Sequence, residues 1–187
     1  MTSGDGALWV SERLVLREPL ETDASLLLAY HARNAARFAP WGPAPPGALP
    51  EHLNWIVWRR EQSAVARGRS FLAFDRAVPQ QLAGLVSLDA IEREPVPVAM
   101  LSYSIDAAYE GRGYAREAVA AVVAHAFGAL GLVRLVAHYH PANERSGALL
   151  RRLGFTIEAA APEIPPALRG LMRPQVMAAR TRNGTAG

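Results

Sequence analysis

Two glycines, Gly111 and Gly113, stand in the segment YEGRGYAREAV, where an apolar-periodic helix is about to begin. Glycine weakens a first helical turn, but it lets a bulky ligand approach the backbone closely. The first N–H groups of a helix lack partners within the helix, and the helix dipole adds partial positive charge there. The pattern therefore favours a phosphate site, although a tight strand-to-helix turn would need the same glycines. It is not a P-loop, because no Gly-Lys-Ser/Thr follows, and it lacks the third glycine of the dinucleotide fingerprint.

A second polar pair, Asn143 and Ser146, occurs in the segment PANERSG. A spacing of three residues is close to one helical turn, so both side chains can face the same side of a cleft. The same pattern is typical of a helix cap, which would use the oxygen of Asn143 and leave its amide group free for a ligand. Ser146 is either a second ligand contact or an ordinary surface serine.

Metal and thiol chemistry find little support in the composition. The chain has 187 residues and no cysteine, which excludes disulfides, thiolate metal sites and a cysteine nucleophile. We interpret the following histidines as structural or exposed, because their spacing is not that of metal ligands: His31, His52, His125 and His138.

The charge pattern gives little reason to expect a nucleic acid or a membrane as the main partner. The net charge of +3 is carried entirely by scattered arginines, and no nucleic-acid-binding motif occurs. No apolar stretch approaches the length of a membrane span, and the N-terminus lacks a basic region followed by an apolar run. We expect a cytoplasmic protein.

The elements that position these residues follow from periodicity and from glycine and proline. Strands are predicted over residues 11–20, 71–74, 82–88, 98–105, 133–141, 155–159 and 175–180. Helices are predicted from an Asp23 cap through Tyr30, from Pro50 to a stop at Gly68, over 115–130 with Gly131 ending it, and over 143–154. The proline-rich stretch 38–50 must be a loop, whereas Trp55 and Trp58 belong to a core or a helix face.

The order of these elements predicts a mixed α/β domain. A helix joins the strands at 98–105 and 133–140, and such a crossover makes two strands parallel and adjacent. Length and hydrophobic content are sufficient for one domain over residues 1–187, with a core from about 10 to 180 and a disordered tail over 181–187.

Two longer segments resemble a known family. LSYSIDAAYEGRGYAREAV followed by VRLVAHYHPANERSGALLRRLGF is similar to the core of the GNAT acyl-CoA N-acyltransferases. Within that family the chain looks like the Rim-type (RimJ/RimL-like) enzymes that acetylate the N-termini of ribosomal proteins, the RimJ branch above all. The resemblance extends from ERLVLREPLETDA to the strand near Val176. It implies a twisted mixed sheet of about six or seven strands flanked by about four helices, with a splayed parallel strand pair forming the acyl-CoA cleft.

The resemblance also implies acetyl-CoA as cosubstrate and no metal. The pyrophosphate would rest on backbone amides between Gly111 and Arg116, and the pantetheine arm would lie between the two parallel strands. The implied cofactor-binding residues are Tyr103, Ser104, Ile105, Gly111, Arg112, Gly113, Tyr114, Ala115, Arg116 and Asn143. Ser146 would lie near the departing thiolate. Transfer would be direct, because no cysteine can carry the acetyl group, and a backbone N–H near Ser104 would stabilise the oxyanion.

The acceptor side is implied by weaker matches. Glu163 is the first candidate for the general base, Glu158 the second and His140 the third. Trp41, in FAPWGP, matches a loop that borders the acceptor entrance in the Rim-type enzymes. The expected acceptor is the N-terminal α-amine of a protein. A small amine such as an aminoglycoside or polyamine, and a non-catalytic CoA-binding regulatory module, remain alternatives; the chain would act as a monomer or homodimer.

Two positions depart from the family pattern. Glu110 stands where the family has Gln or Arg, so a carboxylate lies at the edge of the expected phosphate site. We expect Glu110 to face solvent or to be offset by Arg112 or Arg116. Pro174 stands where the family favours an acidic residue.

Overall fold

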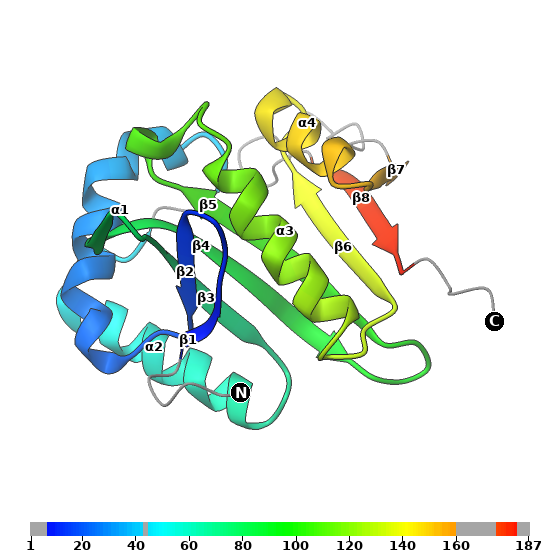
Figure 1. Cartoon of the computed structure of the whole chain (residues 1–187), viewed down its shortest axis with the longest axis horizontal. Helices are drawn as coiled ribbons and strands as arrows, with labels where there is room; N and C mark the ends of the chain where they lie inside the picture. Colours follow the sequence, from blue (N-terminus) through cyan, green and yellow to red (C-terminus); the bar gives the residue numbers. More distant parts are fainter. Residues whose placement is uncertain (1–6, 43–44, 160–174, 183–187) are drawn as a thin grey trace, which may run out of the picture.

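The computed structural model, which describes residues 7–42, 45–159 and 175–182, contains one mixed sheet with helices on both faces (Figure 1). Its eight strands lie in the order β1-β2-β3-β4-β5-β6-β8-β7. They span Ala7–Val10 (β1), Leu14–Arg17 (β2), Arg69–Asp75 (β3), Val78–Glu92 (β4), Val98–Ile105 (β5), Arg134–Tyr139 (β6), Thr156–Ala159 (β7) and Val176–Thr181 (β8). The predicted fold class is confirmed, and β1 is an additional strand that the sequence did not reveal.

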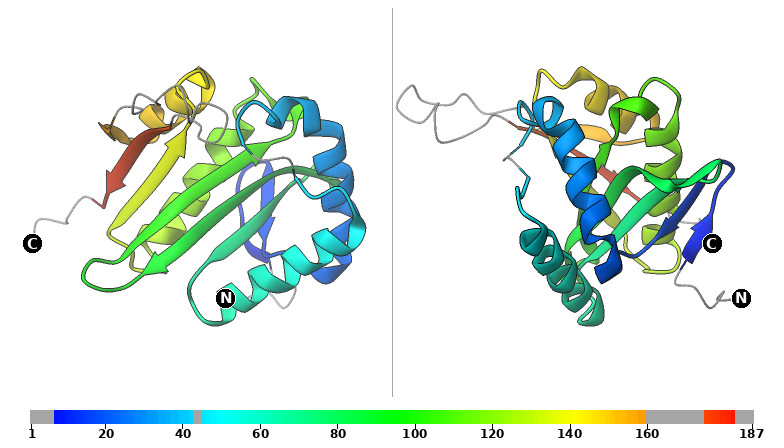
Figure 2. Two further views of the ribbon diagram at one scale, coloured as in Figure 1. Left: turned by 180° about the vertical axis from the view of Figure 1, so that it is seen from behind. Right: turned by 90° about the vertical axis from the view of Figure 1, so that its left-hand side faces the viewer.

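Four α-helices cover the sheet within the described residues. They are α1 (Ala24–Phe38), α2 (Leu49–Ala64), α3 (Tyr114–Phe127) and α4 (Glu144–Arg152), with short 3-10 turns at Glu21–Asp23 and Ala107–Tyr109. Helices α1 and α2 lie on one face, and α3 crosses the other face with α4 beside it (Figures 1 and 2). No helix in the described ranges is long and apolar enough to cross a membrane.

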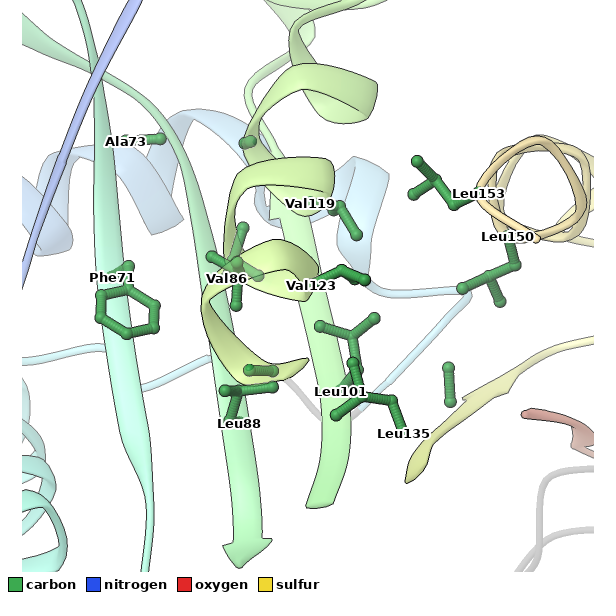
Figure 3. Packing of buried hydrophobic residues seen from close by; sticks show 14 of the residues in the cluster. Phe71, Ala73, Val86, Leu88, Leu101, Val119, Val123, Leu135, Leu150 and Leu153 are labelled. Atoms are coloured by element: carbon green, nitrogen blue, oxygen red, sulfur yellow. The ribbon is translucent and has the colours of Figure 1, made fainter. Parts of the chain in front are cut away.

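The larger core lies under α3. Its apolar residues recur at steps of three and four and are buried at Ala118, Val119, Val122, Val123 and Ala126, as the periodicity predicts. They pack on β3 to β6, and Leu150 and Leu153 complete the cluster from the α4 side (Figure 3). A second cluster joins α1 and α2 to the opposite face through Leu27, Tyr30, Ile56, Leu72, Phe74 and Leu82, with Trp55 packed against it.

Strands β5 and β6 are parallel neighbours, as the crossover helix predicts. Every other neighbouring pair in the sheet is antiparallel. The strand direction therefore alternates across the sheet except at one place, between β5 and β6, which run the same way.

Several boundaries differ from the predictions. Helix α3 ends at Phe127, where Gly128 is the C-cap, rather than at residue 130, and α2 ends at Ala64. Strand β8 reaches Thr181, which pairs with Arg134, so the sheet extends past the predicted start of a disordered tail.

Asp23 was predicted to cap α1, and it occupies the cap position, but its side chain does not form the capping hydrogen bond. Its carboxylate instead accepts from both terminal nitrogens of Arg17, each at 2.6 Å, and from the Leu20 N–H at 2.7 Å. An arginine on the adjacent strand is a stronger partner for the carboxylate than the neutral N–H groups of the helix.

Candidate active site

The parallel strands part partway along their length. Residues 98–101 of β5 pair with 134–137 of β6, and the pairing ends at Leu101 and Ala137. Strand β5 nevertheless continues to Ile105 and β6 to Tyr139. The two strands diverge beyond this point (Figure 1), so Tyr103, Ser104 and Ile105 lie at the opening.

The direction of the backbone groups at this opening follows from the neighbouring strand. The Asp106 N–H donates to the Ala83 carbonyl at 2.9 Å, and the β4–β5 register is unbroken beside it. Hydrogen-bonded positions alternate along an antiparallel pair, so the Ser104 N–H also points to β4. The N–H groups of Tyr103 and Ile105 point to the β6 side, so these are the backbone N–H groups near Ser104 that face the opening.

The glycine turn precedes α3 as expected, and its conformation requires glycine. Gly111 has φ +67° and Gly113 has φ +83°, in the region that side chains disfavour. A Cβ at Gly111 would meet no atom within 4 Å, so the backbone there is open to a ligand. The side chain of Tyr114 is buried, and its hydroxyl donates to Asp75. Tyr114 can therefore contribute only its backbone to the predicted phosphate site.

A clamp from the N-terminal hairpin holds this turn. Arg13 donates to the Arg112 carbonyl at 2.8 Å and forms an ion pair with Glu117, in the first turn of α3, at 2.8 Å. The same carboxylate accepts from the Ser11 hydroxyl at 2.6 Å. Despite its burial, these bonds keep the pKa of Glu117 below its usual value. A turn fixed in this way keeps its N–H groups oriented before a ligand arrives.

Glu110 is neither free in solvent nor offset by Arg112 or Arg116. Its carboxylate pairs with Arg37 from α1 and, at 2.8 Å, with Arg145 from α4. Arg37 also donates to the carbonyl of Ile105 at 2.8 Å. The carboxylate that departs from the family pattern is therefore neutralised by arginines from two other elements.

Ser146, at the start of α4, contacts Tyr103 across the opening, and Asn143 caps the same helix. The Asn143 side-chain oxygen accepts from the Ser146 N–H at 3.1 Å, which confirms the cap. The Ser146 hydroxyl lies 2.8 Å from the Tyr103 hydroxyl. Burial raises the pKa of Tyr103 to about 12, so its phenol keeps its proton at neutral pH. The result is a pair of neutral hydroxyls from β5 and α4, suited to donate a hydrogen bond to a developing anion.

A buried polar network anchors the open end of β5 to α1. Asn34 donates to the Asp106 carboxylate at 2.9 Å and accepts from the Ala107 N–H at 3.0 Å. Arg33 pairs with the same carboxylate, and the Tyr30 hydroxyl lies 2.8 Å from that of Ser104. Burial tends to raise the pKa of Asp106, but bonds from Ala108, Asn34 and Arg33 outweigh it and lower the pKa. No sequence spacing indicated this network.

Of the two carboxylates expected as general bases, only Glu158 lies within the described residues. Glu163 and Pro174 lie outside the described residues. Glu158, on β7, is bonded to Arg134 at 2.9 Å, and this hydrogen bond lowers its pKa. Because Arg134 stands at the paired end of β5 and β6, the carboxylate of Glu158 is held toward the closed end of the strand pair.

The Trp41 loop reaches the end of β6. The Trp41 ring is 38% exposed, and its centroid lies 5.8 Å from that of His140, the third candidate base. The Nδ1 atom of His140 accepts from the Ala142 N–H at 3.2 Å, so this nitrogen is already occupied. The structure thus brings Trp41 and His140 together, a contact between residues distant in sequence.

Comparison with known proteins assigns this arrangement to a family. The family model described as an acetyltransferase (GNAT) domain matches residues 13–156. The chain is 28% identical to the [ribosomal protein uS5]-alanine N-acetyltransferase of Escherichia coli (strain K12) over 155 residues, which are 82% of this chain and 80% of that protein. The solved structure of ribosomal-protein-S5-alanine acetyltransferase from Vibrio fischeri is similar with a TM-score of 0.84 and 26% identity, over 92% of this chain and 95% of that one. RimL, a ribosomal L7/L12 α-N-protein acetyltransferase in complex with coenzyme A, shares the fold at a TM-score of 0.82 and 22% identity, over 94% and 97% of the two chains.

Proposed function

The chain belongs to the GNAT family of acetyltransferases, and from this premise we propose that it acetylates the N-terminal α-amine of a protein, a ribosomal protein above all, using acetyl-CoA. One observation carries the proposal. Strands β5 and β6 part beside the hydroxyl pair of Tyr103 and Ser146, with the glycine turn at the start of α3 on the same side of the sheet. The similarity to a uS5-alanine N-acetyltransferase supports the acceptor class.

The residues present fit acetyl-CoA. Backbone N–H groups at the start of α3 and the open space beside Gly111 suit its pyrophosphate. The gap between β5 and β6 beyond Leu101 suits its extended arm. The amide nitrogen of Asn143, which has no hydrogen-bond partner among the described residues, suits a carbonyl of that arm. When bound, acetyl-CoA supplies an activated thioester carbonyl.

The chain's own groups then have distinct tasks. The N–H of Tyr103 or Ile105 stabilises the negative charge on the carbonyl oxygen, and the Ser146–Tyr103 pair donates a hydrogen bond to the leaving sulfur. An α-amine with a pKa near about 8 is mostly protonated at neutral pH, so a base is needed. We assign that role to Glu163, with the acceptor chain passing between the Trp41 loop and the segment after Phe155.

A thiol-release assay tests the proposal. Acetyl-CoA is offered with peptides that begin Ser or Ala, and separately with a polyamine and an aminoglycoside. We expect turnover of the peptides, a preference for small first residues and loss of kcat in Glu163→Gln. Trp41→Ala should reduce peptide turnover selectively, because a small amine does not need the loop. Turnover of the small amines alone would overturn the protein acceptor and leave an acetyltransferase of a different substrate class.

A further inference from the structure

A second cavity lies away from the acetyl-CoA cleft, between the C-terminal half of α2 and the end of β4. Its volume is about 510 Å³, and polar side chains dominate its lining. The lining includes Trp58, Arg59, Arg67, Asp89, Glu92 and Glu94. None of these residues has a part in the acetyl transfer described above.

Arg59 forms the inner wall of this cavity and is incompletely bonded. Its side chain is only 13% exposed, it pairs with Asp89, and its guanidinium lies about equally close to Trp55 (5.0 Å) and Trp58 (4.9 Å). Within the part of the chain that the structure describes, its buried Nε finds no hydrogen-bond partner. Buried donors are nearly always bonded, and leaving one unbonded costs about 1–3 kcal/mol. One donor at the inner wall, the Nε–H of Arg59, is therefore left without an acceptor among the described residues.

The backbone at the cavity is distorted in a way that shapes it. The β4–β5 register shifts between Asp89 and Glu92, and Ala90 has φ +47°, a left-handed conformation that is uncommon for alanine. Such bulges re-aim side chains next to binding sites. Here the bulge lies where Asp89 turns toward α2 and Arg59.

The cavity is connected to the cleft along an exposed face of β5. Ser104, Ser102 and Met100 alternate on the face of β5 away from α3. Helix α1 reaches this face at Ser104 through Tyr30, whereas Ser102 and Met100 are exposed (Figure 2, left). The Ser102 hydroxyl donates to Asp89 at 3.1 Å, and Asp89 pairs in register with Met100. From Ser104 to Met100 is four residues, or about 13 Å, which an extended chain spans with about four residues.

The charges decide which side chain fits. Arg59 and Asp89 compensate each other, and Arg93 donates to the Leu130 carbonyl at 2.6 Å. Among the described residues Arg67 has no ion pair. Glu92 and Glu94 are exposed, so solvent screens their charge more than it screens that of Arg59. The cavity thus offers donors to a carboxylate, from Arg59 at its inner wall and from the exposed Arg67.

Resting on the proposed function, we propose that this cavity is a specificity subsite that binds an acidic side chain of the acceptor polypeptide, at about the fourth or fifth residue from the acetylated amine. The carboxylate accepts from Arg59 and Arg67, while the intervening residues lie along the exposed face of β5. The first residue is selected at the cleft, and the downstream residue is selected here.

The test compares ten-residue acceptor peptides that differ only in carrying Glu, Gln or Lys at one of positions three to six. For the wild-type protein we expect Glu at position four or five to raise kcat/KM about tenfold over Gln, a difference of about 1.4 kcal/mol, with Lys lowest. Arg67→Gln, an exposed change that spares the core, should abolish this preference, whereas Arg60→Gln, an exposed arginine of α2 outside the cavity lining, should keep it. Glu92→Gln should strengthen it.

Two controls separate the subsite from the reaction. The Kd for acetyl-CoA and the turnover of a three-residue peptide, too short to reach the cavity, should be the same in the wild-type protein and in Arg67→Gln. Efficient acetylation of Glu, Gln and Lys peptides alike, or a preference for Lys, would overturn the subsite and leave the proposed function standing. Absence of peptide turnover would overturn both.

Discussion

Tyr103 and Ser146 belong to segments 43 residues apart in sequence, yet their hydroxyls lie 2.8 Å from each other. This contact makes one unit of two residues that the sequence presented separately, one as a cofactor contact and one as a catalytic candidate. Residues that act through one hydrogen bond show strongly non-additive effects when both are changed.

We therefore expect Ser146→Ala and Tyr103→Phe each to lower kcat by about 10²-fold, with little change in the Kd for acetyl-CoA. The double variant should be about as slow as the slower single variant. Because burial raises the pKa of Tyr103 to about 12, its phenol should not cause kcat to fall between pH 8 and 10. Steady-state kinetics and calorimetry measure these quantities. Loss of acetyl-CoA binding with kcat intact would make Ser146 a ligand contact only.

The glycines of α3 offer a matched pair for testing the phosphate site. Gly111, before the helix, and Gly131, after it, have φ +67° and +64°, and a Cβ at either would meet no atom within 4 Å. Alanine at each should cost a similar free energy of unfolding, about 1–2 kcal/mol. Only Gly111→Ala should weaken acetyl-CoA binding, by about tenfold or 1.4 kcal/mol, as measured by calorimetry alongside thermal unfolding. Equal affinities in the two variants would remove Gly111 from the site.

At the scale of single residues, local conformations could be predicted from the sequence better than long-range hydrogen-bond partners. The glycine turn and the Asn143 cap follow from local rules, because φ preference and capping depend on a few neighbouring residues. The partners of Glu110 and Asp106 could not be predicted, since each is bonded to residues about 70 positions away in α1. Long-range ion pairing depends on how helices dock, which periodicity does not specify.

Helices α1 and α2 are joined through a histidine pair. His31 Nδ1 lies 2.8 Å from His52 Nε2, and the His52 Nδ1 lies 2.9 Å from the Ala48 carbonyl. Burial, with His52 nearby, lowers the pKa of His31 to about 4. Its folded pKa is thus below the unfolded value of about 6.5, so the folded state binds fewer protons.

The linkage predicts the pH dependence of stability. The contribution of His31 is fully present above about pH 6.5 and is lost as the pH falls from about 6.5 toward 4. We expect the free energy of unfolding to drop by about 1 kcal/mol between pH 7.5 and 5, after allowance for the partial exposure of the ring. In urea unfolding, the free energies of unfolding of the wild-type protein and of His31→Gln should differ at pH 7.5 and be nearly equal at pH 5. If the free energies of unfolding of the two proteins change with pH in the same way, His31 is not the cause of the pH dependence.

At the scale of elements, most of the fold could be predicted. The crossover helix required β5 and β6 to be parallel, and the apolar period of α3 fixed the face that it buries. Ends were less predictable, because α3 stops at Phe127 while its apolar pattern continues to Leu130. Strand β1 was not predicted because its four residues show no clear alternation of apolar and polar side chains. It is a strand because it pairs with β2.

The whole molecule consists of two groups of strands that share little backbone pairing. Strands β1–β5 and β6–β8 meet through the register of Val98–Leu101 with Arg134–Ala137. The proposed acetyl-CoA site lies between the ends that diverge. A ligand there contacts both groups of strands and should stabilise the molecule as a whole.

We expect acetyl-CoA at about 100 times its Kd to add about 2.7 kcal/mol to the free energy of unfolding. For a chain of this size the melting temperature should rise by about 5–10 °C. Hydrogen exchange should slow most at the diverging ends of β5 and β6 and at the start of α3. Protection confined to the β1–β2 side would place the ligand elsewhere.

The order of the strands also bears on the synthesis of the chain. From β1 to β6 each strand is added beside the one made before it, but β8 lies between β6 and β7. On the ribosome, β7 therefore emerges before the strand that gives it a place in the sheet, and β6 keeps an unpaired edge until residues 176–181 arrive. Unpaired edges promote aggregation. A stop codon just before β8 should thus yield aggregates, although it removes none of the residues proposed for catalysis.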